Sequence, residues 1–115
     1  SLKEPGVYKT GPNTYDAYVL ARQFVYRPRK ITIPANSTVT FHLTSPDVIH
    51  GFEIVGTNVN TMVIPGRIGK FTVKFDQAKT YGLLCHEYCG VGHHLMEGQV
   101  EVVSQSQFDA TEEGT

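Results

Sequence analysis

The stretch Thr38-Val39-Thr40-Phe41-His42-Leu43-Thr44 alternates strictly between apolar and polar side chains. A period of two is typical of a β-strand with one buried face, so the valine, phenylalanine and leucine of this stretch are expected to face the core. Residues Lys70 to Phe75 repeat the pattern, and so do Gln99 to Val102 near the end of the chain. Strands are therefore predicted to be the main elements.

Turn-forming residues separate these runs from two further β-rich segments, Tyr15 to Ala21 and Lys30 to Ile33. Pro, Gly, Asn and Asp gather at residues 11–13, 34–36, 45–47 and 65–66. Several short strands bounded by turns predict an all-β fold, an antiparallel sandwich of two sheets with Greek-key connections. No helix and no internal repeat is expected, and residues 55–64 are predicted to form a long loop because they lack alternation.

Length and composition limit the functions that are possible. A chain of 115 residues with 40% hydrophobic and 18% charged side chains is typical of one globular domain. Its net charge of −1 provides no basic surface, which argues against nucleic-acid binding. No apolar run reaches the roughly 18 residues of a membrane-spanning helix. We expect a soluble, monomeric fragment with a flexible segment over residues 1–9, a folded domain over 10–103 and an acidic tail over 104–115.

Potential ligands concentrate in residues 85–96, Cys-His-Glu-Tyr-Cys-Gly-Val-Gly-His-His-Leu-Met. Both cysteines, three of the five histidines and one of the two methionines lie there. The segment follows an apolar run and precedes the last expected strand, so it is predicted to be a loop at one end of the sandwich. His50 comes from a distant strand end, which a two-sheet fold could bring beside this loop.

Several interpretations of this cluster are open. Cys85 and Cys89 could form a disulfide, or could complete a tetrahedral zinc site with His50 and His93. Neither gives Met96 a role, whereas thioether and thiolate donors together favour copper. One blue-copper ion would use a single cysteine. Two copper ions bridged by both thiolates would use every donor, with the methionine on one ion and a backbone carbonyl on the other.

Two polar residues outside the cluster have alternative interpretations. Asp47, three residues before His50, is a candidate for orienting that imidazole by a hydrogen bond. The sequence Ser45-Pro46-Asp47 could equally be a plain turn. His42 falls on the polar face of its strand and is expected to be solvated.

The spacing Cys85-x-Glu87-x-Cys89-Gly90-x-x-His93-x-x-Met96, with Asp47-Val48-Ile49-His50 upstream, resembles the dinuclear copper (CuA) motif of cytochrome c oxidase subunit II. The resemblance extends over roughly Thr10 to Val103 and looks closest to the ba3-type branch. It implies a cupredoxin-like sandwich that binds two copper ions. The implied ligands are the bridging sulfurs of Cys85 and Cys89, the imidazoles of His50 and His93, the axial Met96 and the main-chain oxygen of Glu87.

The resemblance also implies a function and partners. Cytochrome c would dock transiently and donate an electron, which would pass through the copper pair to haem in subunit I for the reduction of oxygen. Such a domain belongs to an oxidoreductase but is not expected to turn over alone. Relatives carry an N-terminal membrane hairpin, so the resemblance implies a soluble piece of a membrane-anchored protein at the periplasmic face of the bacterial inner membrane.

Other functions compete with this one. The copper domain of nitrous oxide reductase shares the ligand spacing, although it usually has aromatic residues in place of Glu87. A copper chaperone would need the helices of a thioredoxin-like fold. A zinc-bound or disulfide-stapled binding module would have no redox role. Counting the bound metal ions would separate these classes.

Three further positions follow from the resemblance. Pro65-Gly66-Arg67 resembles a motif that lies towards subunit I in relatives, which makes Arg67 a candidate for the outgoing electron path; a turn with a solvated arginine is the alternative. Phe52 stands where many relatives have a tryptophan that accepts electrons, and this chain has no Trp. It is a candidate for the incoming path or a core residue. In many relatives Glu87 also gives its carboxylate to a magnesium or manganese ion shared with subunit I.

Overall fold

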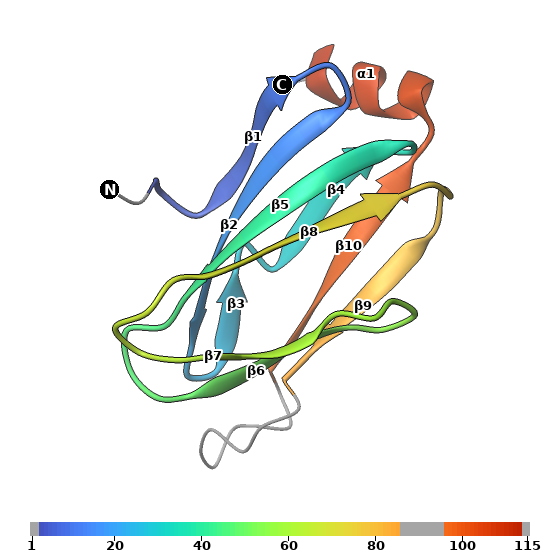
Figure 1. Cartoon of the computed structure of the whole chain (residues 1–115). Helices are drawn as coiled ribbons and strands as arrows, with labels where there is room; N and C mark the ends of the chain where they lie inside the picture. Colours follow the sequence, from blue (N-terminus) through green and yellow to red (C-terminus); the bar gives the residue numbers. More distant parts are fainter. Residues whose placement is uncertain (1–2, 86–95, 114–115) are drawn as a thin grey trace.

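Two strands with alternating burial form the centre of one sheet. A computed structural model of the chain describes residues 3–85 and 96–113 and places strand β2 (Thr14–Arg22) beside β5 (Ser37–Thr44) (Figure 1). Ala17 lies opposite Phe41, and Val19 lies opposite Leu43. All four side chains are buried, because cross-strand partners share a face of the sheet. The predicted strand and its buried face are confirmed.

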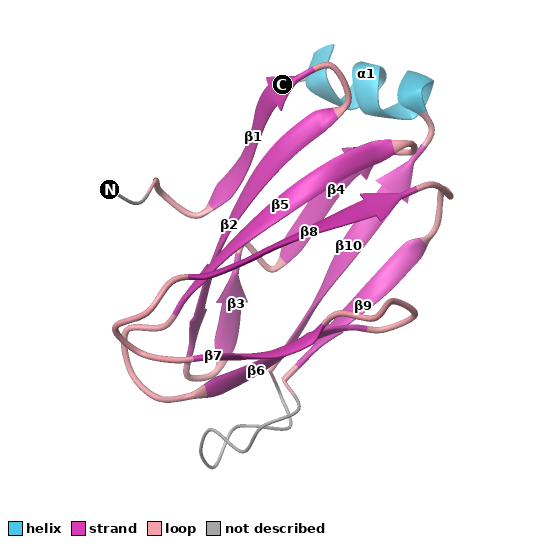
Figure 2. Ribbon diagram, in the orientation of Figure 1, coloured by secondary structure: helices cyan, strands magenta, loops and turns pink. Residues whose placement is uncertain are grey.

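The other described elements complete a sandwich of two sheets (Figure 2). They are β1 (Gly6–Gly11), β3 (Val25–Arg27), β4 (Lys30–Pro34), β6 (His50–Ile54), β7 (Asn60–Val63), β8 (Gly69–Phe75), β9 (Thr80–Leu84), β10 (Glu97–Val103) and α1 (Gln105–Glu113). Sheet I has the order β1-β2-β5-β8, with β3 paired to β2, and sheet II has the order β4-β10-β9-β6-β7. The predicted all-β sandwich is confirmed.

The sequence had suggested purely antiparallel strands, but two pairs of strands are parallel. β2 pairs in parallel with β5, and β4 pairs in parallel with β10. Between β2 and β5 the chain leaves sheet I, runs through β4 in sheet II and returns. Such a crossover brings the returning strand back in the same direction, so a purely antiparallel prediction was wrong for these pairs.

Aromatic side chains fill the space between the sheets. Phe41 lies in sheet I with its ring 5.2 Å from that of Phe71 and 5.8 Å from that of Phe52, which comes from sheet II. Burying a phenylalanine contributes about 1.5–3 kcal/mol, so this cluster ties the two sheets firmly together. The aromatic cluster consequently packs sheet I against the strand of sheet II that begins at His50.

The C-terminal segment forms a helix, which corrects the expectation of a helix-free chain ending in a polar tail from residue 104. The Gln107 N–H donates to the Ser104 hydroxyl at 3.2 Å, a helix cap, and the Phe108 side chain is buried with its ring 5.9 Å from that of Tyr15. This helix, α1, is too short to cross a membrane, and the described residues contain no other helix.

Two other expected irregular segments contain strands. Residues 6–9, expected to be flexible, belong to β1, where Val7 packs against the core and the Tyr8 ring lies edge-on to that of Tyr18. Residues 55–64, expected to be a long loop, include β7, which pairs with β6. Both are edge strands of their sheets, and edge strands need less regular burial than central ones, so alternation was too weak to reveal them.

Candidate metal centre

Cys85 and Met96 lie next to each other across the end of a strand pair. β9 and β10 are antiparallel, and their last pair is Leu84 opposite Glu97. Cys85 directly follows that pair on one strand and Met96 directly precedes it on the other. The two residues are only 8% and 2% exposed. The sheet register therefore gathers a thiol and a thioether at one buried position.

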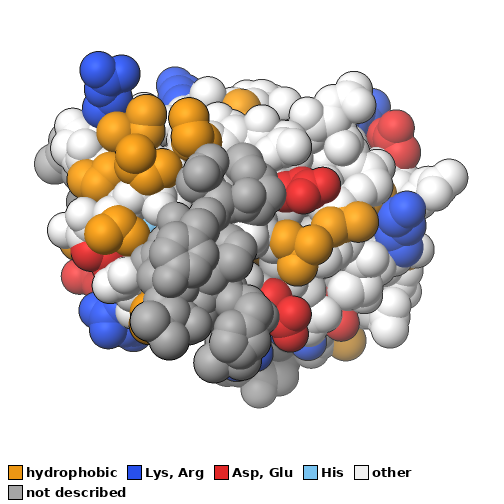
Figure 3. Space-filling model, turned by 90° about the horizontal axis from the view of Figure 1, so that it is seen from below, with side chains coloured by type: hydrophobic (Ala, Val, Ile, Leu, Met, Phe, Trp, Pro, Cys, Tyr) orange, Lys and Arg blue, Asp and Glu red, His pale blue; other side chains and the backbone are white. Residues whose placement is uncertain are grey.

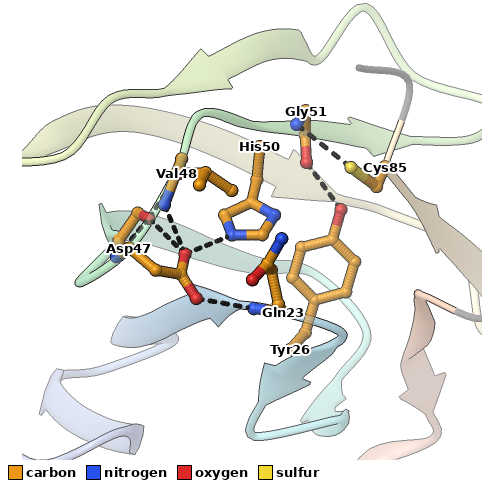
Figure 4. Close-up of polar contacts among 8 residues, drawn as sticks. Gln23, Tyr26, Asp47, Val48, His50, Gly51 and Cys85 are labelled. Atoms are coloured by element: carbon orange, nitrogen blue, oxygen red, sulfur yellow. Dashed lines mark hydrogen bonds and ion pairs between the residues drawn. The ribbon is translucent and has the colours of Figure 1, made fainter. Parts of the chain in front are cut away.

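His50 reaches the same place from the third strand. It is the first residue of β6 and is completely buried. The backbone N–H of the following residue, Gly51, donates to the Sγ atom of Cys85 at 3.3 Å (Figure 4). The strand that carries His50 thus contacts Cys85, which lies 35 positions further along the sequence than His50.

The loop before β6 is built around Asp47. Its Oδ1 atom lies 2.8 Å from Nε2 of His50 and accepts the Val48 N–H at 2.6 Å. Its Oδ2 atom accepts the Gln23 N–H from the turn between β2 and β3, also at 2.8 Å. The Ser45 hydroxyl closes the loop by donating to the Val48 carbonyl at 2.6 Å. One carboxylate therefore links two loops to the histidine ring.

These contacts keep Asp47 ionised. Burial by itself would raise its pKa, but the hydrogen bonds from the Gln23 N–H, the His50 ring and the Val48 N–H, together with the charge of His50, outweigh burial and lower the pKa from 3.8 to about 2. An ionised carboxylate only accepts hydrogen bonds. The Nε2 atom of His50 must therefore carry a hydrogen, and in the neutral imidazole the lone pair is on Nδ1.

The Nδ1 atom of His50 is the feature that fits a metal ion. It is buried and has no hydrogen-bond partner among the described residues. Leaving such an atom unsatisfied costs about 1–3 kcal/mol, and a histidine that binds a metal through one nitrogen usually donates its other N–H to a carboxylate. A buried imidazole, thiol and thioether at one end of the sandwich form a donor set that suits copper.

The other predicted ligands, Glu87, Cys89 and His93, lie outside the described residues. Within residues 3–85 and 96–113, no group of three or more His, Cys, Asp or Glu side chains could hold a metal ion. Among the described residues, the candidate centre is therefore limited to Cys85, Met96, His50 and its partner Asp47.

The two residues that the resemblance connected with electron paths occupy different environments. Phe52 is completely buried, with its ring edge-on to that of Tyr26 at 5.5 Å, so its surroundings are those of a core residue. Arg67 is exposed in the turn between β7 and β8, where its backbone N–H donates to the Ile64 carbonyl at 3.1 Å. Asp47 contacts the ring of His50, whereas Phe52 lies in the core and Arg67 lies in an exposed turn.

His42 is not solvated, contrary to expectation. Its side chain is 14% exposed, its ring stacks on that of Tyr18 at 4.3 Å, and its Nε2 atom lies 3.4 Å from a carboxylate oxygen of Asp16. Tyr18 and His42 are register partners on adjacent strands, so the two flat rings cover each other on the outer face of sheet I.

Two residues beside the centre gave no signal in the sequence. Gln23 contributes a main-chain N–H, which every residue except proline has, so its identity indicates nothing. The Tyr26 hydroxyl donates to the Gly51 carbonyl at 2.6 Å and is buried. Tyr26 lies between the two β-rich segments that the sequence indicated, and the partner of its hydroxyl is 25 positions away, so no local pattern revealed the contact.

Exposed hydrophobic side chains gather at the end of the molecule that holds the centre. Figure 3 views this end and shows hydrophobic groups on its surface. The loop before β6 exposes Val48 and Ile49, β7 exposes Met62, and the turn after β7 exposes Ile68. An exposed apolar surface of this kind often marks a contact with another protein.

Curated proteins with similar sequences are oxidase subunits. The chain is 45% identical over 96 residues to cytochrome c oxidase subunit 2 proteins of Thermus thermophilus, covering 84% of this chain and 71% or 57% of theirs. It is 35% identical over 80 residues to the heme-copper oxidase subunit 2 of Aeropyrum pernix, covering 68% of this chain and 34% of that one. The chain thus spans only part of each of these relatives.

Solved structures agree with the sequence relatives. A heme-copper terminal oxidase dimer contains a chain that is 41% identical and superposes with a TM-score of 0.81, with 86% of this chain and 71% of that chain covered. The periplasmic domain of cytochrome oxidase subunit II from Bradyrhizobium japonicum has the same fold, at 22% identity and a TM-score of 0.77, covering 86% and 91%. Residues 14–103 match the family described as cytochrome c oxidase subunit II, periplasmic domain, and the chain belongs to that family.

Proposed function

We propose that this domain accepts single electrons from a cytochrome c at a dinuclear copper centre and passes them to haem in the catalytic subunit of a terminal oxidase. The observation that carries the proposal is the buried Nδ1 atom of His50. Asp47 holds the other ring nitrogen, Nε2, and the N–H of the next residue, Gly51, donates to the sulfur of Cys85. Such an imidazole is held ready to bind a metal beside a thiolate.

The proposed ligands are Cys85 and Cys89 as bridging thiolates, His50 and His93 as imidazoles, Met96 as a weak axial donor and the main-chain oxygen of Glu87. When bound, the copper pair would supply a one-electron carrier whose charge is spread over both ions. Cys85 and Met96 are buried directly beside the ends of β9 and β10, and His50 is buried at the start of β6. These strands would hold their donors in place as the charge changes.

Transient docking of the donor is supported by the exposed apolar side chains around the centre. Val48 and Ile49 are close in sequence to His50, and Ile49 is 44% exposed. A cytochrome that contacted this loop would approach the centre with little intervening protein. The net charge of −1 provides no strong general field to steer the donor, and the exposed apolar side chains offer it a contact surface.

The oxidase role is favoured over the other functions by the family. The relatives described above are subunits of oxidases, which supports association with a haem-bearing subunit I in preference to a nitrous oxide reductase. A zinc-bound or disulfide-stapled module receives no support from these relatives, which are oxidase subunits.

Metal counting together with electron paramagnetic resonance tests the proposal. The purified chain, loaded with copper, is expected to bind two ions and to show the hyperfine pattern of an electron shared equally by two copper nuclei. A single-copper pattern, or one zinc ion in preference to copper, would contradict the proposed centre.

Replacement of one thiolate tests the bridge. Cys85→Ser is expected to abolish the paired site and to leave at most one copper ion with a different spectrum, because a hydroxyl is a poor substitute for a bridging thiolate. Circular dichroism should show that the variant is folded. Retention of two copper ions with an unchanged absorption spectrum would show that Cys85 does not bridge them.

A further inference from the structure

A short hydrogen-bonded chain crosses the sandwich from Tyr26 to Cys85. Tyr26 lies in β3 of sheet I and is completely buried. Its hydroxyl donates to the carbonyl of Gly51, in β6 of sheet II, at 2.6 Å. The N–H of Gly51 donates in turn to Sγ of Cys85 at 3.3 Å (Figure 4). Both contacts are buried, and both depend on the position of the same glycine.

The N–H···S contact lies outside the regular strand pairing. β6 pairs with β9 through Glu53 and Ile54, and Gly51 lies beyond these pairs. On its other side Gly51 is the register partner of Met62 in β7. Since the amide faces Cys85 where the β6–β9 ladder has ended, the direction of its N–H depends on the contacts that hold Gly51 in place.

We propose that Tyr26 is a positioning residue of the copper centre, whose hydroxyl fixes Gly51 and so maintains the N–H···S bond that raises the reduction potential of the centre. The inference rests on the proposed function, because it needs Cys85 to be a copper ligand. An N–H that donates to a thiolate draws electron density from the sulfur and favours the more electron-rich, reduced form. Hydrogen bonding around a cysteine ligand is a known means of tuning copper potentials.

Tyr26 acts on the sulfur through position and not through polarisation of the amide. The carbonyl of Gly51 belongs to the peptide group shared with Phe52, whereas its N–H belongs to the peptide group shared with His50. The hydroxyl therefore binds one peptide group while the neighbouring peptide group contacts the sulfur. Loss of the hydroxyl would free the glycine to shift, which would weaken the contact with Cys85.

Tyr26→Phe is the informative variant because it removes only the hydroxyl. The ring would keep its edge-on contact with Phe52, at 5.5 Å, so the core remains filled. Tyr81→Phe is a matched control, since Tyr81 is also buried in the core but lies in β9 with its ring against that of Phe75, 5.1 Å away. Both substitutions delete one tyrosine hydroxyl from the same sandwich.

The test measures the equilibrium of the copper-loaded protein with a redox dye of known potential. Tyr26→Phe is expected to shift this equilibrium towards the oxidised protein by about threefold to tenfold, where tenfold corresponds to 59 mV for a one-electron couple. Copper content and the two-copper hyperfine pattern should be unchanged. Tyr81→Phe should leave the equilibrium as in the unsubstituted chain.

The outcomes separate this inference from the proposed function. A Tyr26→Phe protein that binds two copper ions with the potential of the Tyr81→Phe control would overturn the positioning role and leave the proposed function standing. A fall in the thermal midpoint without any change in potential would assign Tyr26 a structural role only, and would also overturn the inference. If the unsubstituted chain bound no copper pair, the proposed function itself would fail.

If Tyr26→Phe does not fold, a measurement on the unsubstituted chain tests the N–H···S contact without which the inference fails. Protein produced in heavy water carries N–D groups at buried amides, and an N–D···S contact changes the copper–sulfur stretching frequency seen by resonance Raman spectroscopy. A frequency shift relative to protein produced in ordinary water is expected. The absence of a shift would show that Gly51 does not donate to a copper-bound sulfur and would overturn the inference.

Discussion

Two histidines in this sandwich lie beside an aspartate, yet only one is suited to bind a metal. His50 Nε2 lies 2.8 Å from Asp47, and His42 Nε2 lies 3.4 Å from Asp16. Each ring also has one buried nitrogen without a hydrogen-bond partner among the described residues, Nδ1 in His50 and Nε2 in His42. A buried imidazole beside a carboxylate is therefore not enough to define a ligand.

The difference lies in what surrounds each ring. His42 is in the middle of β5, and its flat face is covered by Tyr18. The atom without a hydrogen-bond partner in His42, Nε2, is the one nearest the carboxylate, 3.4 Å from an oxygen of Asp16. In His50 the Asp47 carboxylate contacts Nε2, and Nδ1 has no hydrogen-bond partner among the described residues. His50 lies at a strand end, next to Gly51, whose N–H donates to the sulfur of Cys85.

We therefore expect strand ends, more than strand centres, to carry the proposed metal ligands in this fold. A strand centre fixes its neighbours by the sheet register, and those neighbours are chosen for packing. Where strands end, several segments of the chain lie close together and their backbone groups are no longer paired in the sheet. Side chains from distant segments can therefore meet there. His50, Cys85 and Met96 each lie at or directly beside the end of a strand.

The largest expected difference between the two histidines is in copper content. His50→Ala is expected to lose the copper pair, since one ion would lack its imidazole, whereas His42→Ala should bind two copper ions like the unsubstituted chain. Elemental analysis of dialysed, copper-loaded protein measures this directly. Equal loss of copper from both variants would break the comparison and would give His42 a role in the site.

The second-largest expected difference is in copper affinity, between variants of Asp47 and of Asp16. Asp47→Asn removes the charge that holds the His50 N–H, and loss of such a partner typically lowers metal affinity by about 10–100-fold. Asp16→Asn is the matched control and should leave the affinity unchanged. Competition with a copper chelator of known affinity gives both values. An unchanged affinity in Asp47→Asn would show that the loop holds the imidazole without help from the carboxylate.

Much of the fold could be predicted because alternation records which face of a strand is buried. Val39, Phe41 and Leu43 are buried as expected, and the same holds for Val100 in β10. The helix α1 was missed because its composition is polar, although Ser104 followed three residues later by Gln107 is the pattern of a helix cap. Local polarity outweighed that signal.

Part of the candidate site could also be predicted from the sequence, and part could not. The clustering of ligand types around residues 85–96 was visible in the sequence, as was the proximity of Asp47 to His50. The placement of Cys85 beside Met96 depends on the register of β9 and β10, which the whole sheet determines. The contact from Tyr26 depends on how two sheets pack, and no local pattern encodes it.

A smaller change is expected at Met96. Met96→Leu keeps a buried hydrophobic side chain of similar volume but removes the thioether, the weak donor proposed for this centre. Both copper ions should be retained, while the reduction potential changes. Met62→Leu, at an exposed position 48% accessible to solvent, is the control and should change neither property. Complete loss of copper from Met96→Leu would show that the thioether is essential for binding.

The smallest expected effect is on the acid stability of the metal-free chain. Because the folded-state pKa of Asp47 is about 2, below its ordinary value of 3.8, its ionised form stabilises the fold above about pH 4, and this stabilisation is lost as the pH falls towards 2. The full shift would be worth about 1.4 kcal/mol per pKa unit, but solvent screening of this exposed residue reduces the expected contribution to the order of 1 kcal/mol. Chemical denaturation of the unsubstituted chain and of Asp47→Asn should show a stability gap at pH 7 that narrows towards pH 2. A stability gap that stayed constant over this range would mean that the Asp47 side chain stabilises the loop by its shape and by neutral hydrogen bonds. The charge of Asp47 would then not distinguish the surroundings of His50 from those of His42.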